Sequence, residues 1–347
     1  MSPASALATE LISRGCRVEL ATDERGKKYE DMFPDIEVHV MKSGTAGTGL
    51  KGKIKGAVNM IHGVVLQGFF LIRREKPNIV IGFGGYPSVP AVFAAQMRRV
   101  PTGLHEQNAV LGKANKFLAS KARFIALSLA PQEELTGRTA RKMVVTGNPV
   151  RPEIIALKDV PYPAIEPDGH INIFVMGGSL GATVFSEVVP KALAMSPEDQ
   201  KKRIKVVQQC RKSDLEKAKA IYEEAGIEAT LEPFFDDVAG ELAKAHLFIG
   251  RSGASTVAEI SIAGRPAIYV PYPYHKDQQQ KKNAQGIVDK GGAWIMSQAQ
   301  FTPDALVERI DMIFQNPETL SRAAARAKEC GLPDAVERLA DLVLKNI

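Results

Sequence analysis

The sequence predicts an α/β protein built from two consecutive parallel-sheet units. Three observations support this. The 347 residues exceed one ordinary core and suit two domains. Short apolar segments alternate with amphipathic ones along the whole chain, which is typical of βα units. Two prolines within Gly147–Pro152 interrupt any helix or central strand. We therefore expect an N-terminal domain over 1–150, a C-terminal domain over 151–332 and a last helix over 333–347.

Strands are expected where the apolar, β-rich segments fall. In the first half these segments are 17–21, 36–41, 78–82, 102–106 and 123–128, and in the second half 171–176, 205–209, 229–232, 247–250, 267–270 and 293–296. An amphipathic helix over 3–14 follows Met1 with no strand before it. Because the first strand of a doubly wound domain lies in the middle of its sheet, we expect the N-terminal domain to lack that strand and its glycine loop.

Composition and charge exclude several classes of protein. The three cysteines, Cys16, Cys210 and Cys330, are widely spaced and indicate neither a disulfide framework nor a zinc site. We find no apolar run of the ~20 residues that cross a bilayer and no secretion signal. Residues 1–150 carry 21 Lys and Arg against 12 Asp and Glu, a net charge of +9, whereas 151–347 carry a net −3. The first half therefore suits an anionic surface, either nucleic acid or lipid headgroups.

The clearest site motif is the glycine-rich segment 177–182, which follows the strand expected over Ile171–Met176 and precedes a helix to about Ala194. A strand, a glycine turn and a helix N-terminus offer free backbone N–H groups to a phosphate, and Ser179 adds a hydroxyl. The spacing departs from G-x-G-x-x-G, which disfavours a nicotinamide dinucleotide. The alternative is a tight turn without a ligand.

A second glycine loop, Gly84-Gly85-Tyr86, lies between a strand and a helix expected over 90–98, and a structural role is equally compatible with it. Because ligands of open parallel sheets bind beyond the carboxyl ends of the strands, both loops would lie on ligand-binding edges.

Two further polar segments follow strands of the second half. In Arg251–Glu259, the Thr256-x-x-Glu259 spacing fits a capping box, whereas the functional interpretation lets the Glu259 carboxylate accept bonds from two ribose hydroxyls. In His275–Gln280, the amides could bind sugar hydroxyls or simply begin a helix.

Five motifs occur together in the order and spacing of the MurG-type N-acetylglucosaminyltransferases of bacterial cell-wall synthesis, and this resemblance covers essentially the whole chain. The motifs are His105–Asn108, Gly147–Arg151, Gly177–Ser179, Arg251–Ala254 with Thr256 and Glu259, and His275–Asp277 with Gln279 and Gln280. The resemblance implies a GT-B fold, in which two Rossmann-like domains face a cleft. It also implies inverting transfer of N-acetylglucosamine from UDP-N-acetylglucosamine to lipid-linked N-acetylmuramyl-pentapeptide pyrophosphate, at the cytoplasmic face of the inner membrane.

Carried over residue by residue, the resemblance assigns most of the donor site to the second domain. Arg151 and Ser179 would hold the pyrophosphate, Phe235 the uracil and Glu259 the ribose. The nucleotide and its sugar would also be lined by Ala254, Ser255, Thr256, Val257, Ala258, Gln279, Gln280 and, from the first domain, Asn108. Gly84, Gly85 and Tyr86 would face the acceptor pyrophosphate. His105 and Glu106 are the candidate general bases, and neither a metal nor a cofactor is expected, since D-x-D is absent from the sequence.

The resemblance fails at the start of the chain. Family members begin with a strand, a Gly-Gly-Thr-Gly-Gly-type loop and a histidine, and then continue with a segment resembling Met1–Ala4. We therefore expect that the start codon has been placed too late. Two other functions remain open, namely a hydrolysing UDP-sugar epimerase and an inactive nucleotide-sugar-binding or scaffold protein.

A membrane contact has its own sequence pattern. Lys51, Lys53 and Lys55 precede the apolar segment 58–72, which Arg73 and Arg74 follow. Basic residues around an apolar helix favour an anionic bilayer surface, although a buried core helix has the same pattern. We expect peripheral membrane binding and no nucleic-acid partner.

Overall fold

The chain divides into two compact units in a computed structural model that describes all residues except 45–55, 57–59, 61, 132–136, 167 and 179–181. The first unit comprises Met1–Arg151 together with Pro333–Ile347, and the second comprises Pro152–Leu332. The C-terminal segment thus belongs to the same unit as the N-terminus.

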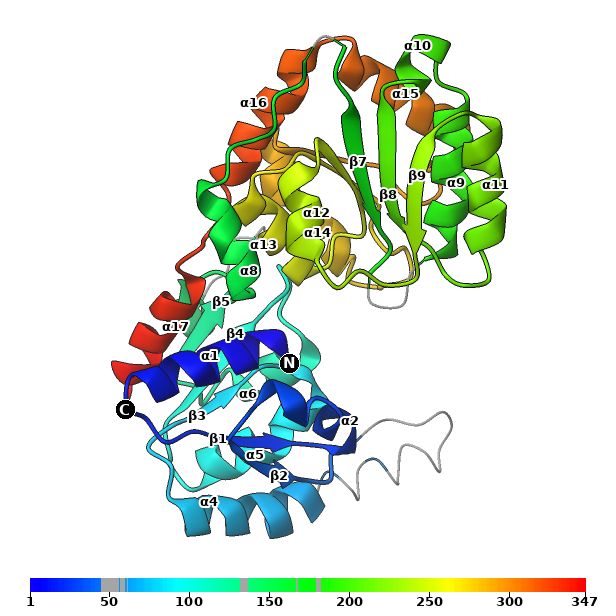
Figure 1. The fold of residues 1–347 in the computed structure, drawn as a ribbon. Helices are drawn as coiled ribbons and strands as arrows, with labels where there is room; N and C mark the ends of the chain where they lie inside the picture. The colour runs from blue at the N-terminus through cyan, green and yellow to red at the C-terminus, as the bar shows by residue number, and fades with distance from the viewer. Residues whose placement is uncertain (45–55, 57–59, 61, 132–136, 167, 179–181) are drawn as a thin grey trace. The chain divides into compact units, whose positions relative to one another are not determined.

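The second unit holds one parallel sheet of six strands (Figure 1). The strands are β7 (Ile171–Met176), β8 (Ile204–Gln209), β9 (Glu228–Glu232), β10 (Leu247–Gly250), β11 (Ala267–Tyr269) and β12 (Ala293–Ile295). Their spatial order is β12-β11-β10-β7-β8-β9, so the direction of strand addition reverses between β7 and β10. Ligands of doubly wound sheets bind at this reversal point, beyond the carboxyl ends of the two strands.

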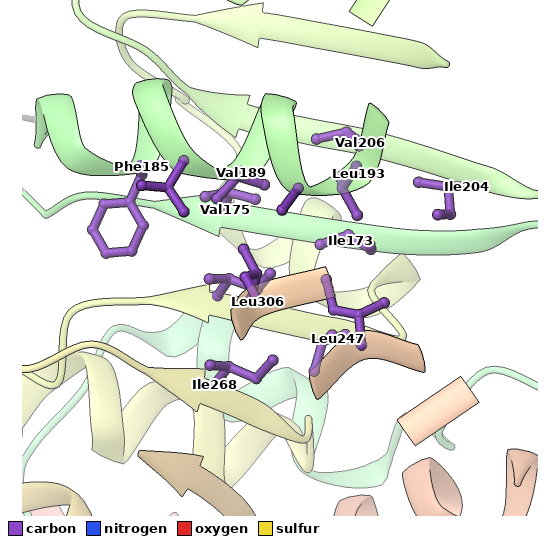
Figure 2. Packing of buried hydrophobic residues seen from close by; sticks show 14 of the residues in the cluster. Ile173, Val175, Phe185, Val189, Leu193, Ile204, Val206, Leu247, Ile268 and Leu306 are labelled. Carbon is purple, nitrogen blue, oxygen red and sulfur yellow. The ribbon is translucent and has the colours of Figure 1, made fainter. Parts of the chain in front are cut away.

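Helices cover both faces of this sheet. They are α8 (Pro152–Ile155), η3 (Ala156–Asp159), α9 (Thr183–Ala194), α10 (Glu198–Lys201), α11 (Leu215–Glu224), α12 (Val238–Lys244), α13 (Ala254–Ala263), α14 (Gln279–Asp289), α15 (Pro303–Phe314) and α16 (Pro317–Lys328). Figure 2 shows how α9 lies along the sheet, with Phe185, Val189 and Leu193 packed against side chains of β7 and β8. Burying these apolar side chains fixes the position of α9 against the sheet.

The first unit contains two separate parallel sheets. β1 (Glu19–Thr22) pairs with β2 (Glu37–Val40), and a second sheet has the order β3-β4-β5-β6. The strands of the second sheet are β3 (Val80–Gly82), β4 (Thr102–Glu106), β5 (Phe124–Leu127) and β6 (Met143–Val145). Within the described residues, β1 and β3 each have an edge that pairs with no strand.

The helices of the first unit are α1 (Ser2–Ser13), α2 (Glu24–Lys27), η1 (Glu30–Met32), the π-helical segment η2 (Gly63–Gly68), α4 (Phe69–Glu75), α5 (Gly85–Met97), α6 (Lys113–Leu118), α7 (Gly137–Ala140) and α17 (Ala335–Leu344). Leu7 and Leu11 of α1 share an apolar cluster with Leu339 and Val343 of α17. Arg14 also forms an ion pair with Asp341 at 2.5 Å. These contacts attach the end of the chain to its beginning.

The strands predicted from the sequence are present with small shifts of their ends, and the α/β class is confirmed. β6 was not predicted, because its apolar run has only three residues, two of which are exposed. The prediction of a helix over 90–98 was wrong about where the helix begins, since α5 begins at Gly85 and contains Pro90. No helix among the described residues is both long enough and apolar enough to cross a membrane.

Candidate functional site

A pocket opens at the reversal point of the six-stranded sheet. Met176 and Gly250, the last residues of β7 and β10, are partners across the sheet, so the connections after them begin at the same level. The pocket is narrow, with a cavity volume of about 30 Å³, and is lined by Phe174, Met176, Gly178, Val238, Leu242, Phe248, Arg251, Thr256, Glu259 and Ile260. Two of the predicted donor-site residues, Thr256 and Glu259, are thus brought together.

The N-terminus of α13 borders this pocket without a side-chain cap. Gly253 is the N-cap residue, and no side chain accepts a hydrogen bond there. Thr256 lies inside the first turn, so the capping-box alternative for Thr256 and Glu259 was wrong: a capping box places its Ser or Thr at the N-cap. The helix therefore presents its first backbone N–H groups and the positive end of its dipole beside the pocket. Ala254 and Val257 are buried under this turn, Ala258 is half-buried and Ser255 is exposed.

Gly177 and Gly178 begin the connection from β7 to α9. Gly178 has φ of 93°, a left-handed conformation that favours glycine, and it lines the pocket. Helix α9 begins after Ala182, again without a side-chain cap. Ser179, the predicted pyrophosphate ligand, lies outside the described residues, so its role stays a prediction.

Phe174 of β7 and Phe248 of β10 line the pocket, and Phe235 lies next to Phe174. Phe235 is half-buried and meets Phe174 edge to face, with ring centroids 5.7 Å apart. Phe174 in turn contacts Phe248 of β10 at 6.0 Å. A flat, weakly polar group such as a nucleobase fits against such aromatic rings. The role predicted for Phe235 is compatible with this arrangement.

The predicted sugar-binding amides lie at the start of α14. Gln280 accepts a hydrogen bond from the backbone N–H of Tyr272 at 2.9 Å through its Oε1 atom. Gln279 is the first residue of the helix, and both amides are half-buried. Asn283, one turn further, is buried and donates to the Ser252 carbonyl at 3.1 Å, which links α14 to the connection before α13. Gln280 thus orders its own loop, and sugar binding by the pair stays a prediction.

Arg251 lines the pocket, although no role was predicted for it from the sequence. Its guanidinium donates to the carbonyls of Val270 (2.9 Å) and Pro271 (3.2 Å) and to Oε1 of Gln298 (2.7 Å). It also lies between the rings of Phe185 and Tyr272, 5.3 and 5.6 Å from their centroids. Burial lowers the pKa of Arg251, yet arginine remains charged. One cation therefore joins the connections that follow β10, β11 and β12.

In the first unit, Glu106 binds the segment that carries Asn108. Its Oε1 atom accepts from the Asn108 N–H at 3.1 Å, and its Oε2 atom accepts from the Gly112 N–H and from Asn115 Nδ2, both at 2.8 Å. The side chain is only 3% exposed. A carboxylate bound in this way orders residues 108–115. These contacts favour a positioning role, and catalysis by Glu106 stays a prediction that they do not support.

His105 is completely buried beside Glu106. Gln107 Nε2 donates to its Nδ1 atom at 3.0 Å, and its Nε2 atom donates to the Gly147 carbonyl at 3.3 Å, so the imidazole is neutral. Burial lowers the pKa of His105 to about 4, while the bond to Gly147 opposes the shift. With no exposed surface, the ring has no path to a substrate in this structure. Catalysis by His105 likewise stays a prediction that its surroundings do not support.

The buried imidazole predicts acid sensitivity of the first unit. The pKa of about 4 in the folded protein lies below the ordinary histidine value of 6.5, so folded protein binds fewer protons than unfolded protein in this range. Stability is therefore complete above pH 6.5 and falls as the pH drops toward 4, by about 3 kcal/mol in total. Urea unfolding of the wild type and of His105→Gln between pH 7.5 and 4.5 checks this. The stability lost on acidification should be smaller in the variant, and equal losses would exclude His105 as the cause.

The remaining predicted residues also belong to the first unit. Gly84 and Gly85 have φ of 74° and 69° at the start of α5, and Tyr86 is 43% exposed in its first turn. The Ser88 hydroxyl donates to the Gly84 carbonyl at 2.8 Å. Arg151 is exposed at the last position before the second unit. Contact of these residues with the pocket of the second unit stays a prediction.

Comparison with known proteins identifies the family of this chain. The glycosyltransferase family 28 N-terminal domain matches residues 1–127, and the family 28 C-terminal domain matches residues 172–339. The chain belongs to glycosyltransferase family 28. Its relative from Rhodospirillum centenum, a UDP-N-acetylglucosamine--N-acetylmuramyl-(pentapeptide) pyrophosphoryl-undecaprenol N-acetylglucosamine transferase, is 50% identical over 99% of this chain and 90% of its own length.

Solved structures agree with the family 28 assignment. A structure of Acinetobacter baumannii MurG superposes with a TM-score of 0.81 at 28% identity, covering 99% of this chain and 95% of that one. The GT-B fold of two Rossmann-like units and the resemblance to the MurG-type enzymes are thereby confirmed. A UDP-GlcNAc 2-epimerase from Neisseria meningitidis, bound to UDP-GlcNAc, superposes with a TM-score of 0.61 at 13% identity, covering 94% of this chain and 90% of that one. At that identity the likeness shows only that the fold is shared.

Proposed function

We propose that this family 28 chain transfers N-acetylglucosamine from UDP-N-acetylglucosamine to undecaprenyl-pyrophosphoryl N-acetylmuramyl-pentapeptide. The product is the lipid-linked disaccharide precursor of peptidoglycan. The relative from Rhodospirillum centenum carries this activity in its name, and it matches nearly the whole chain. The observation in the structure that carries the proposal is the pocket at the ends of β7 and β10. Glu259 and the aromatic side chains of Phe174 and Phe248 line this pocket, and the N-terminus of α13 beside it has no side-chain cap.

Each part of a UDP-sugar has a matching group around this pocket. The uracil would lie against Phe235 and Phe174, and the Glu259 carboxylate would accept bonds from the ribose hydroxyls. The pyrophosphate would lie at the helix starts that follow β7 and β10, where backbone N–H groups and helix dipoles favour an anion. Ser179 and Arg151 would add a hydroxyl and a permanent positive charge.

The proposed reaction is a single displacement with inversion at the anomeric carbon. The acceptor hydroxyl oxygen bonds to that carbon and loses its proton to a base, while the bond to the diphosphate breaks and UDP leaves with the electron pair. Negative charge grows on the leaving diphosphate, so preorganised donors at that position lower the barrier. On the acceptor side, the start of α5 at Gly84 and Gly85 would receive the lipid pyrophosphate.

We also propose that the first unit binds the anionic surface of a bilayer from its cytoplasmic side. Leu66 and Phe70 are 60% and 65% exposed on η2 and α4, although Val64 and Ile72 of the same segment are buried.

A second exposed aromatic side chain lies on α6. Phe117 of α6 is 59% exposed and stacks on Phe93 of α5. Exposed lysines of or next to α6 accompany this apolar surface, namely Lys113, Lys116 and Lys121. Large exposed apolar side chains flanked by lysines suit the headgroup region of a membrane.

Replacing the exposed apolar side chains should weaken membrane binding. We expect Leu66→Ser/Phe70→Ser to bind vesicles containing anionic phospholipid about tenfold less tightly, because each side chain contributes burial energy only when inserted. Vesicle sedimentation at several salt concentrations measures the effect. The matched control is Met195→Ser/Met312→Ser, which removes two exposed apolar side chains from the second unit. Equal binding of the two double variants would argue against the proposed surface.

A reconstituted assay tests the proposed reaction against both alternatives. With donor and lipid acceptor in vesicles, we expect one UDP released for each disaccharide lipid formed, and with donor alone we expect neither UDP nor an epimerised sugar. UDP release and epimerisation without acceptor would instead identify a hydrolysing epimerase. Tight donor binding with no turnover in either mixture would identify a nucleotide-sugar-binding protein.

A further inference from the structure

The last residue of β8, Gln209, contacts two connections that border the pocket of the second unit. Its Oε1 atom accepts a hydrogen bond from the Gly177 N–H at 3.2 Å, and its Nε2 atom donates to the Pro233 carbonyl at 3.3 Å. Gly177 begins the connection from β7 to α9, and Pro233 lies two residues before Phe235. The side chain is 4% exposed, so water has little access to either bond.

The chemistry of the two partners fixes the orientation of this amide. A backbone N–H can only donate and a carbonyl oxygen can only accept, so Oε1 must face Gly177 and Nε2 must face Pro233. Neighbouring residues fasten the same strand end to α9: Arg211 donates to the Thr183 hydroxyl at 3.3 Å, and Cys210 donates to the Ser186 hydroxyl at 3.0 Å. Gln209 therefore lies in an ordered setting and spans the two connections directly.

We propose that Gln209 is a positioning residue that sets the spacing between the phosphate side and the base side of the UDP site. This inference rests on the proposed function. A ligand that contacts both sides binds most tightly when the separation of the two sides is fixed before binding, because no binding energy is then lost in ordering them. The Gln209 amide supplies that separation through one buried side chain, without contact between Gln209 and the nucleotide.

The preceding residue, Gln208, offers a matched control. Successive side chains of a strand point to opposite faces, and Gln208 accepts a hydrogen bond from the Tyr222 hydroxyl of α11 at 2.7 Å. It is completely buried and lies on the same strand. The Gln208 side chain therefore contacts α11 rather than the connections around the pocket. Removing either amide costs buried hydrogen bonds, but only Gln209 is linked to both sides of the nucleotide.

The experiment compares Gln209→Met with Gln208→Met by calorimetric titration with UDP and with uridine. For Gln209→Met we expect UDP to bind about tenfold more weakly, equivalent to ~1.4 kcal/mol. The affinity for uridine should change much less, because uridine has no diphosphate and does not reach both sides of the site. The KM for UDP-N-acetylglucosamine should rise in parallel. Gln208→Met should bind UDP within about twofold of the wild type while melting at a lower temperature.

Gln209→Glu provides a second variant that keeps the shape of the side chain. Its carboxylate still accepts from Gly177 but repels the Pro233 carbonyl, so we expect the same selective loss of UDP binding. Hydrogen exchange at the Gly177 amide should be faster in Gln209→Met, because the side-chain oxygen that accepts its hydrogen bond is removed.

Failure of the inference is distinguishable from failure of the proposed function. Should wild-type protein bind UDP while both Gln209 variants bind it equally well, the positioning role is excluded. The same holds if UDP and uridine weaken equally, since that indicates a general loss of structure. If the wild type binds no UDP at all, the proposed function itself fails.

Discussion

Glu259→Ala should reduce kcat/KM for UDP-N-acetylglucosamine by about 100-fold. The Glu259 carboxylate, which lines the pocket, is proposed to accept hydrogen bonds from two ribose hydroxyls. Each hydrogen bond to a charged group contributes about 1.5 kcal/mol or more. The ribose assignment is checked with UDP and 2′-deoxy-UDP. Wild-type protein should prefer UDP, whereas the variant should bind both ligands equally weakly.

Glu241→Gln is the matched control for that experiment. Glu241 lies on α12, the helix whose Val238 and Leu242 line the same pocket, but its carboxylate pairs with Lys244 at 3.2 Å outside it. Activity within about twofold of wild type is expected, because exposed ion pairs contribute little. If Glu259→Ala kept the wild-type preference for UDP over 2′-deoxy-UDP, the ribose contact would be ruled out.

Arg265→Met should have the largest effect on stability. Arg265 is fully buried and donates to the carbonyls of Leu242 (2.6 Å), Ala243 (2.9 Å) and Ala263 (2.7 Å), at the carboxyl ends of α12 and α13. There its charge complements both helix dipoles. Without it these buried carbonyls lose their donors, so we expect the free energy of unfolding to fall by about 3 kcal/mol or more. For a unit of this size the midpoint of melting should fall by about 10 °C.

Scanning calorimetry of the wild type and Arg265→Met measures this loss, with Arg338→Met as the control. Arg338 is exposed on α17 and pairs with Asp334 at 2.7 Å, so its removal should change stability by less than about 0.5 kcal/mol. Because α12 and α13 both line the pocket, UDP should also bind Arg265→Met more weakly at temperatures below its transition. A midpoint unchanged from the wild type would show that the helix ends do not depend on Arg265.

Much of the fold was predictable because its strands are short apolar runs followed by glycine turns. Residues 171–176 show why: both faces of β7 are covered, so the strand is almost continuously apolar, and the glycine connection follows directly. β6 escaped prediction because the apolar run of this short, partly exposed edge strand has only three residues. The start of α5 also escaped prediction, since Pro87 and Pro90 suggest an interruption, whereas the helix tolerates both.

The candidate site was predictable where one segment holds all the necessary groups. Thr256 and Glu259 lie one turn apart on α13, so their spacing alone places them on the same side of a helix. The functions of Gln209 and Arg251 depend instead on partners far along the chain, which the sequence pattern does not reveal. Catalysis by Glu106 stays a prediction from its motif, whereas the contacts that the sequence did not reveal, with Asn108, Gly112 and Asn115, indicate ordering of a segment.

The central claim is that UDP binds at the reversal point of the six-stranded sheet, with its pyrophosphate at the helix starts after β7 and β10. Hydrogen exchange with and without UDP tests it most directly. The account predicts slower exchange at the beginnings of α9 and α13 and in the segment around Phe235, with no change at the amino ends of β8 and β9. Protection confined to other segments, or none at saturating UDP, would contradict it.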